Sequence, residues 1–138
     1  MKYLILLLFL VSCSMKTINQ CDNWYIVSPP SELQKTDKVT IFNWCVKNIS
    51  YKSYANGFHP AQQTLDEQTG NCANISLLVL ALDNNINGSH GDLILCCHSD
   101  NILHYTPRID GEIIEPGITQ IFQVIKWNDI PEYIYLRQ

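Results

Sequence analysis

The stretch 69–82, TGNCANISLLVLAL, places a cysteine at the start of the most apolar segment of the chain. Cys72 follows Gly70 and Asn71, in the first turn of the helix that this segment predicts. The first N–H groups of a helix lack partners within it, and the helix dipole is positive at that end, so both favour a thiolate. Cys72 is therefore a candidate nucleophile, although a small residue can also start a helix without taking part in chemistry.

A thiolate nucleophile needs a base, and the chain has four histidines from which to supply it. His59 and His90 fall in the loops before and after the cysteine helix, and His98 ends a strand beside a turn. His104 lies inside the strand pattern ILHYT, where a polar ring among apolar neighbours calls for a reason. We therefore expect His104 to be the base.

The hairpin that follows His104 selects a carboxylate to orient the ring. Asp110-Gly111, between two alternating runs, predicts a two-residue turn. Counting outward from this turn pairs Thr106 with Glu115, which puts Glu115 on the same face as His104 and diagonally across from it. The count requires that Pro107, which cannot donate a ladder hydrogen bond, introduces no bulge.

These placements together predict a catalytic triad of Cys72, His104 and Glu115. The imidazole would accept the thiol proton, and the carboxylate would fix the tautomer of the ring. The alternative is a helix-starting cysteine, a strand histidine and a surface glutamate that are unrelated, since unreactive cysteines are common. The independent count that puts His104 and Glu115 on one face favours catalysis.

The segments that must position these residues begin with helices. Apolar residues at intervals of three and four predict an amphipathic helix from Ser31 to about Ser50, and they are Leu33, Val39, Phe42, Cys45 or Val46, and Ile49. A short helix opened by Pro60 follows. The helix that carries Cys72 is apolar nearly all round, which indicates a central buried position, and Gly88 ends it.

After Gly88 the pattern alternates with the period of a strand. We expect strands in 92–98, 102–109, 112–116, 121–127 and 132–137, the last forming a closing edge strand. Helices first and an antiparallel sheet second is the order of an α+β domain, with the cysteine helix packed on the sheet.

The N-terminal residues form a separate unit. An apolar run, Leu4 to Val11, is too short to span a bilayer but fits an export signal, and it leads into LVSC. That tetrapeptide resembles the bacterial lipobox, whose cysteine receives a diacylglyceryl group. We expect a signal peptide over 1–12, a lipid on Cys13, a tether over 13–30 and the domain over 31–138, anchored to a membrane of the cell envelope. An ordinary signal peptide cleaved elsewhere is the alternative.

Composition restricts the class of protein further. The 138 residues, 46% hydrophobic and 16% charged, fit one compact domain, and a net charge of −4 with no Lys or Arg cluster excludes nucleic acid as a partner. No CxxC or histidine-rich spacing accompanies the cysteines, so we expect neither a metal site nor a cofactor. Apart from Cys13 and Cys72, the cysteines could pair or stay as buried free thiols; they are Cys21, Cys45, Cys96 and Cys97.

Five elements in the order of the chain resemble the transglutaminase-like cysteine-peptidase superfamily. They are Ile49 to Tyr51 (I-x-Y), Pro60 to Leu65 (P-A-x-x-T-L), Gly70 to Cys72 (G-x-C), the strand histidine His104, and Glu115-Pro116, and they lie within Val39 to Pro116. Family members usually have Asp where this chain has Glu115.

The resemblance implies a papain-like, transglutaminase-core fold and a thioester formed on Cys72 during attack on a peptide or another amide, such as a cell-wall peptide. The backbone N–H of Cys72 and an upstream side chain would meet the oxyanion, and Tyr51 and Trp44 are the candidates by position. Two other functions remain open: a papain-class cell-wall endopeptidase, and a catalytically inactive binding or exclusion lipoprotein on the same scaffold.

Overall fold

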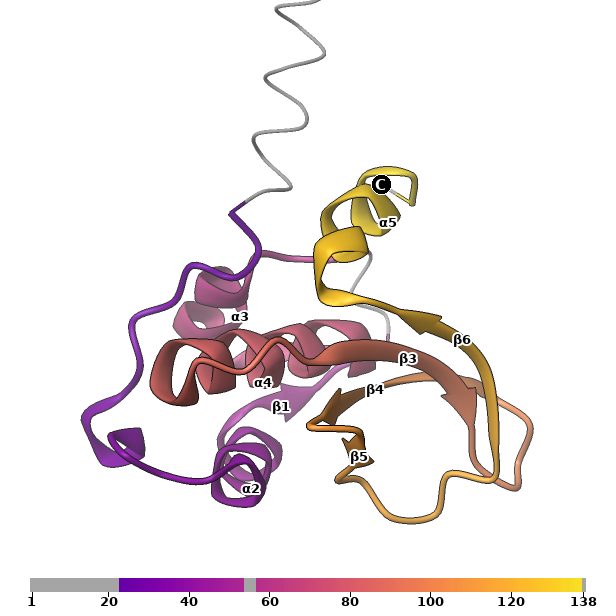
Figure 1. The fold of residues 1–138 in the computed structure, drawn as a ribbon, viewed down its shortest axis with the longest axis horizontal. Helices are drawn as coiled ribbons and strands as arrows, with labels where there is room; N and C mark the ends of the chain where they lie inside the picture. Colours follow the sequence, from indigo (N-terminus) through magenta and orange to yellow (C-terminus); the bar gives the residue numbers. More distant parts are fainter. Residues whose placement is uncertain (1–22, 54–56, 138) are drawn as a thin grey trace, which may run out of the picture.

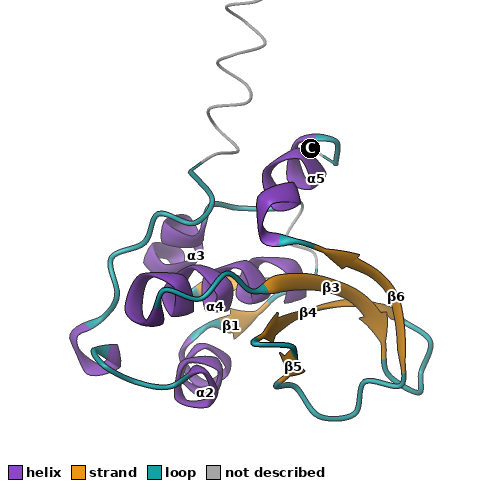
Figure 2. Ribbon diagram, viewed as in Figure 1, coloured by secondary structure: helices purple, strands orange, loops and turns teal. Residues whose placement is uncertain are grey.

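The structure, a computed structural model, describes residues 23–53 and 57–137. The expected signal peptide, the lipidation residue Cys13 and the first part of the tether, which includes Cys21, lie outside these residues. Most of the helices gather at one side of the molecule and an antiparallel sheet curls around the other, with the C-terminal helix above the sheet in this view (Figures 1 and 2). The expectation of an α+β domain is therefore confirmed. Within the described ranges, no helix is both long enough and apolar enough to cross a membrane.

The first expected helix is shorter than the sequence pattern indicated. A single 3-10 turn, η1 (Ser31–Leu33), precedes α2 (Lys38–Asn48), so the continuous helix from Ser31 was wrong. Helix α2 begins where it does because the Asp37 side chain accepts a hydrogen bond from the backbone N–H of Thr40, 2.8 Å away.

The buried face of α2 agrees with the expected one except at Val39. Ile41, Phe42 and Cys45 are buried, whereas Val39 and Val46 are exposed. Leu33 is buried in η1 and does not belong to this helix, whereas Phe42, Cys45 and the C-cap residue Ile49 are buried as the spacing predicted.

Helix α4 (Cys72–Asn87) is the central element, with α2 and α3 (Ala61–Glu67) packed against it (Figure 1). The Asn71 side chain caps its first turn by accepting from the N–H of Asn74, and Gly88 ends it with φ of 74°. Most of its residues between Ala73 and Asp83 are buried. The expectation of a buried helix that starts at Cys72 is confirmed.

A short parallel pair links the segments on either side of α3. Strand β1 (Ser50–Tyr51) pairs with β2 (Thr69–Gly70), with Tyr51 opposite Gly70. A Cβ on Gly70 would lie 2.8 Å from the Cβ of Asn74, closer than carbon atoms approach, so only glycine allows this entry into α4. The pair therefore places Tyr51 beside the residues that lead to Cys72.

The larger sheet has the order β5-β4-β3-β6. Its strands are β3 (Asp92–Cys97), β4 (Leu103–Ile109), β5 (Glu112–Ile113) and β6 (Gln120–Ile125). The expected two-residue turn at Asp110-Gly111 is present, with Ile109 opposite Glu112. Strands β4 and β5 are paired over two residues each and then separate.

Pro107 explains why the β4–β5 ladder is short. Ile109 and Glu112 close a two-residue turn and so form a hydrogen-bonded pair, which makes Pro107 the next residue of β4 whose N–H would face β5. Proline has no N–H, so the ladder ends after Ile113. The expected pairing of Thr106 with Glu115 does not form.

The last expected strand, 132–137, is a helix. After the 3-10 turn η2 (Trp127–Asp129), α5 (Ile130–Tyr135) begins with Pro131 in its first turn, where proline is favoured. Its buried residues Ile130, Tyr133 and Ile134 have helical spacing. The residue types of this segment favour a strand, but a helix is the conformation that buries these three side chains on one face.

The helical periodicity of α5 gives a stability test with neighbouring residues. Ile134→Ala, at a position 3% exposed, should lower the free energy of unfolding by about 2–5 kcal/mol. Tyr135→Ala, at a position 40% exposed, should change it by no more than about 0.5 kcal/mol. Urea unfolding of both variants measures the difference, and a larger loss for Tyr135→Ala would contradict the helix.

Candidate active site

Three of the residues singled out in the sequence come together from separate elements. Cys72 is the first residue of α4, His104 lies in β4, and Glu115 lies in the segment between β5 and β6. Nε2 of His104 is 2.7 Å from Oε2 of Glu115, and the same ring makes a hydrogen bond with the Cys72 thiol. Because Nε2 is committed to Glu115, Nδ1 is the nitrogen that faces the sulfur.

Backbone groups also point at the Cys72 sulfur. The N–H of Tyr105 donates to Sγ at 3.5 Å, and the N–H of Ala73 is a second donor. The Ser76 hydroxyl, one turn further along α4, donates to the Tyr105 carbonyl at 3.0 Å and so holds the first turn of α4 against β4. These contacts hold the cysteine and histidine segments in a fixed register.

The surroundings of Cys72 favour its thiolate. Burial by itself raises the pKa of this thiol, but the hydrogen bond to His104 and the backbone N–H of Tyr105 outweigh burial and lower the pKa below its usual value. The hydrogen bonds of His104 to Cys72 and then to Glu115 raise the pKa of the imidazole to about 10. The lowered pKa of the thiol and the raised pKa of the imidazole together favour a thiolate and imidazolium pair.

The other described cysteines have the opposite character. Cys45, Cys96 and Cys97 are buried free thiols, so within the described residues the expectation of buried free thiols holds and that of disulfides does not. Burial raises the pKa of Cys45 to about 12 and, with the Glu115 charge as a second cause, that of Cys96 to about 11. Cys72 is thus set apart from these thiols as a nucleophile.

Of the two side chains suggested for the oxyanion, only Tyr51 is at the site. Partial burial, and next the charge of the Cys72 sulfur and a hydrogen bond to it, raise the pKa of Tyr51. Trp44 donates its indole N–H to Glu32 at 3.1 Å and does not line the pocket beside Cys72. The structure therefore does not bring Trp44 to the site, because the residue lies on another face of α2 than the pocket-lining Phe42 and Val46.

A small apolar pocket adjoins the sulfur. Its volume is about 190 Å³, and beside the triad and Tyr51 its apolar wall consists of Phe42, Val46, Ile49 and Ile75. These residues come from α2, the segment after it and α4, so no single spacing in the sequence could identify them. Helical periodicity did mark Phe42, Val46 and Ile49 as apolar, but as core.

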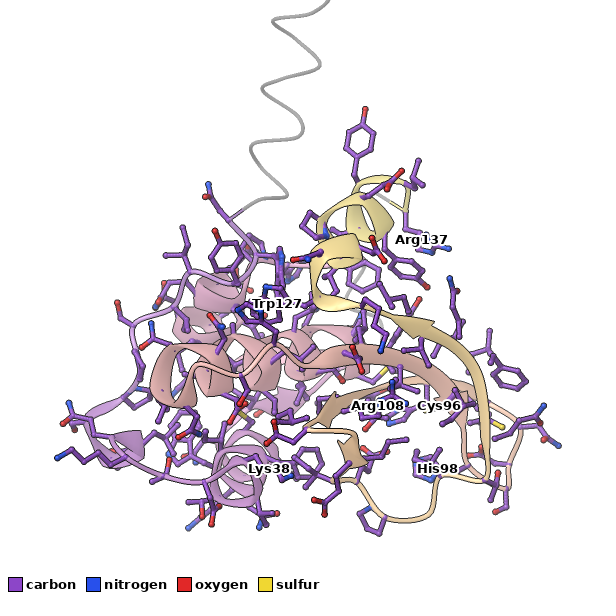
Figure 3. The ribbon with its side chains drawn as sticks, in the orientation of Figure 1. Lys38, Cys96, His98, Arg108, Trp127 and Arg137 are labelled. Atoms are coloured by element: carbon purple, nitrogen blue, oxygen red, sulfur yellow. The ribbon has the colours of Figure 1, made fainter. Side chains whose placement is uncertain are left out.

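His98 is a further residue at the site that sequence analysis placed only at a strand end. Its Nε2 is 3.0 Å from Oε2 of Glu115, the oxygen that also contacts His104, and its Nδ1 is 3.0 Å from the carbonyl oxygen of Gly117. Figure 3 shows His98 beside the segment that joins β5 to β6. In the sequence, His98 lies eight residues after His90 and six before His104, and neither spacing predicts a contact with Glu115.

Comparisons with known proteins found one solved structure of note. No protein-family model matches the chain, and no curated protein matches it. A candidate cysteine protease from Cytophaga hutchinsonii is similar in structure, with a TM-score of 0.49 and 18% sequence identity. The match covers 78% of this chain and 41% of that one. At this level of similarity it assigns no function.

The charge state of Cys72 can be tested by alkylation. At about pH 6.5, iodoacetamide should modify Cys72 before Cys45, Cys96 and Cys97, because the pKa of Cys72 is lowered and the other three thiols are buried. His104→Gln removes the largest cause of the lowered pKa, so the rate at this pH should fall about tenfold and the pH midpoint should move upward. Peptide mass mapping over time measures both effects.

His90→Gln is the matched control, because the His90 ring stacks on Trp127 with the ring centroids 5.1 Å apart and does not line the Cys72 pocket. It should leave the alkylation profile unchanged. An ordinary alkylation midpoint for Cys72 in the unsubstituted protein would contradict the ion pair and would support the inactive scaffold.

Proposed function

We propose that the chain is a transglutaminase-like cysteine hydrolase or acyl transferase that acts on amide bonds through a thioester on Cys72. The observation that carries this proposal is the line of contacts from the Cys72 thiol to His104 and from His104 to Glu115, with 2.7 Å between the last two groups. A nucleophile, a base and an orienting carboxylate in contact are the parts that acyl transfer by a thiol requires.

In the first half of the reaction, the Cys72 thiolate attacks the amide carbonyl carbon and an S–C bond forms. The carbonyl oxygen takes the negative charge, near the backbone N–H of Cys72 at the start of α4 and the Tyr51 hydroxyl. The C–N bond then breaks, and His104 gives its proton to the departing amine. Glu115 holds the ring with Nδ1 toward the sulfur through both steps.

In the second half, water or a second amine attacks the thioester. His104, now neutral, accepts the proton of the attacking group, and the S–C bond breaks to return the thiolate and the imidazolium. Water yields a carboxylate and an amine yields a new amide, so the same residues support hydrolysis and transfer.

The pocket beside the sulfur favours a particular acyl group. Its wall of Phe42, Val46, Ile49 and Ile75 carries no charge, and its volume of about 190 Å³ is below the usual range for a whole ligand. One apolar side chain of the acyl component fits such a space, and its burial there would strengthen binding. We therefore infer a peptide substrate with an apolar residue next to the scissile amide, cell-wall peptides included.

We further propose that the enzyme works in the cell envelope, held to a membrane by a lipid on Cys13. This proposal rests on the apolar run and the LVSC sequence, both outside the described residues. The segment between Cys13 and the domain would then serve as the tether.

Metabolic labelling tests the anchor. With an alkyne-tagged palmitate in a bacterial host, the full chain should take up label, and Cys13→Ala should remove it, because thioether attachment requires that sulfur. Cys21→Ala, eight positions further along, is the control and should stay labelled. Equal labelling of both variants would contradict lipidation at Cys13.

Activated esters test the acyl-enzyme without knowledge of the natural substrate. On mixing with 4-nitrophenyl hexanoate, the protein should release nitrophenol in a burst and gain a hexanoyl mass that maps to Cys72. His104→Gln should slow the burst by at least about a hundredfold, since it removes the base. His90→Gln should react normally. An acyl group found on another residue, or a burst that survives Cys72→Ala, would overturn the proposal.

A further inference from the structure

Three metal-ligating atoms meet beside Cys72. Nε2 of His98 and Nε2 of His104 lie 3.0 Å and 2.7 Å from the same Glu115 oxygen, and all three donor atoms are within 4.8 Å of one another. The donors come from the end of β3, from β4 and from the segment after β5. The carboxylate oxygen thus lies between two imidazole nitrogens.

The second nitrogen of His98 determines what its first nitrogen can do. Nδ1 lies 3.0 Å from the Gly117 carbonyl oxygen, which can only accept, so Nδ1 carries a hydrogen. In the neutral ring Nε2 is then an unprotonated lone pair that faces a carboxylate oxygen at 3.0 Å. Two lone pairs at this distance repel, so the contact calls for a cation, either a proton or a metal ion.

A backbone carbonyl on the far nitrogen is also the arrangement by which proteins orient ligating histidines. Gly117 lies close against the His98 ring. Its φ is 86°, which favours glycine, and a Cβ at this position would lie 3.2 Å from Nδ1 of His98. The ring is therefore held with Nε2 toward Glu115 before any ion binds.

The distances suit zinc. Two ligands at the usual zinc bond lengths, in a tetrahedral arrangement, lie roughly 3.4 Å apart. The observed contacts of 3.0 and 2.7 Å are slightly shorter than this distance, and all three donor atoms lie within 4.8 Å of one another. The side chains are 34% exposed for His98 and 21% for His104 and Glu115, which leaves a route for a hydrated ion.

We propose that His98, His104 and Glu115 bind a divalent ion of the zinc class, with water in the fourth position. Binding itself is independent of the proposed function. Its consequence rests on that function: with the ion on Nε2, the His104 ring cannot hold protons on both nitrogens, and the imidazolium partner of the Cys72 thiolate is lost. Zinc is then a reversible inhibitor that competes with the triad for His104 and Glu115.

The test is zinc binding to the full chain, reduced and freed of metal, measured by competition with a chromophoric chelator. The unsubstituted protein should bind one equivalent that His98→Ala and His98→Gln each weaken at least tenfold. Cys72→Ala should bind zinc at least as tightly, since the sulfur is not a ligand and its hydrogen bond no longer favours a proton on His104. His90→Ala is the matched control, because its ring stacks on Trp127 outside the cluster. Circular dichroism establishes that each variant is folded.

A second readout separates this proposal from the function. Zinc should slow alkylation of Cys72 in the unsubstituted protein and, at the same concentration, much less in His98→Ala. Loss of binding in Cys72→Ala would assign the ion to the thiol, and unchanged binding in both His98 variants would exclude this histidine; either result overturns the proposal. If zinc binds as expected but no acyl group reaches Cys72, the metal site stands and the proposed function fails.

Discussion

The site depends on how the first turn of α4 is held against β4. The Ser76 hydroxyl donates to the Tyr105 carbonyl, and the Tyr105 N–H donates to the Cys72 sulfur, so one peptide segment of β4 binds the helix at two points. His104 directly precedes Tyr105, so these two contacts hold its backbone beside the sulfur. The nucleophile and its base are thus positioned by backbone and core groups, and Glu115 then sets the orientation of the ring.

Burial acts in the same direction on the pKa of Cys45, Cys72 and Cys96, and local partners decide the outcome. Desolvation raises the pKa of Cys45 and Cys96, whereas at Cys72 the same effect is exceeded by the His104 ring and by backbone N–H groups. Position at a helix N-terminus is therefore only part of the cause. The His104 ring contributes what the helix end alone would not, and its hydrogen bonds to Cys72 and then to Glu115 favour its protonated form.

Glu115 contacts His104 as expected, but not through the strand pairing that the sequence predicted. The hairpin turn was predictable because Asp110-Gly111 is a local signal, and its register is correct through Arg108 and Ile113. Beyond that point Pro107 ends the ladder, and the chain turns so that Glu115 meets His98 as well as His104, while the Gly117 carbonyl contacts the other nitrogen of His98. Residue spacing could not predict that two histidines contact one carboxylate. The contact depends on where the segment after β5 packs against the ends of β3 and β4.

The sequence by itself determined the elements whose signals are local. These are the buried helix between Asn71 and Gly88, the two-residue turn, the alternating strands before residue 126 and the α+β order. The tertiary structure alone decided the start of α2, the helical state of α5, the pocket wall and the placement of His98. Each of these depends on which face is buried or which distant segments touch, and such contacts are set by packing of the whole chain rather than by the propensity of any one segment.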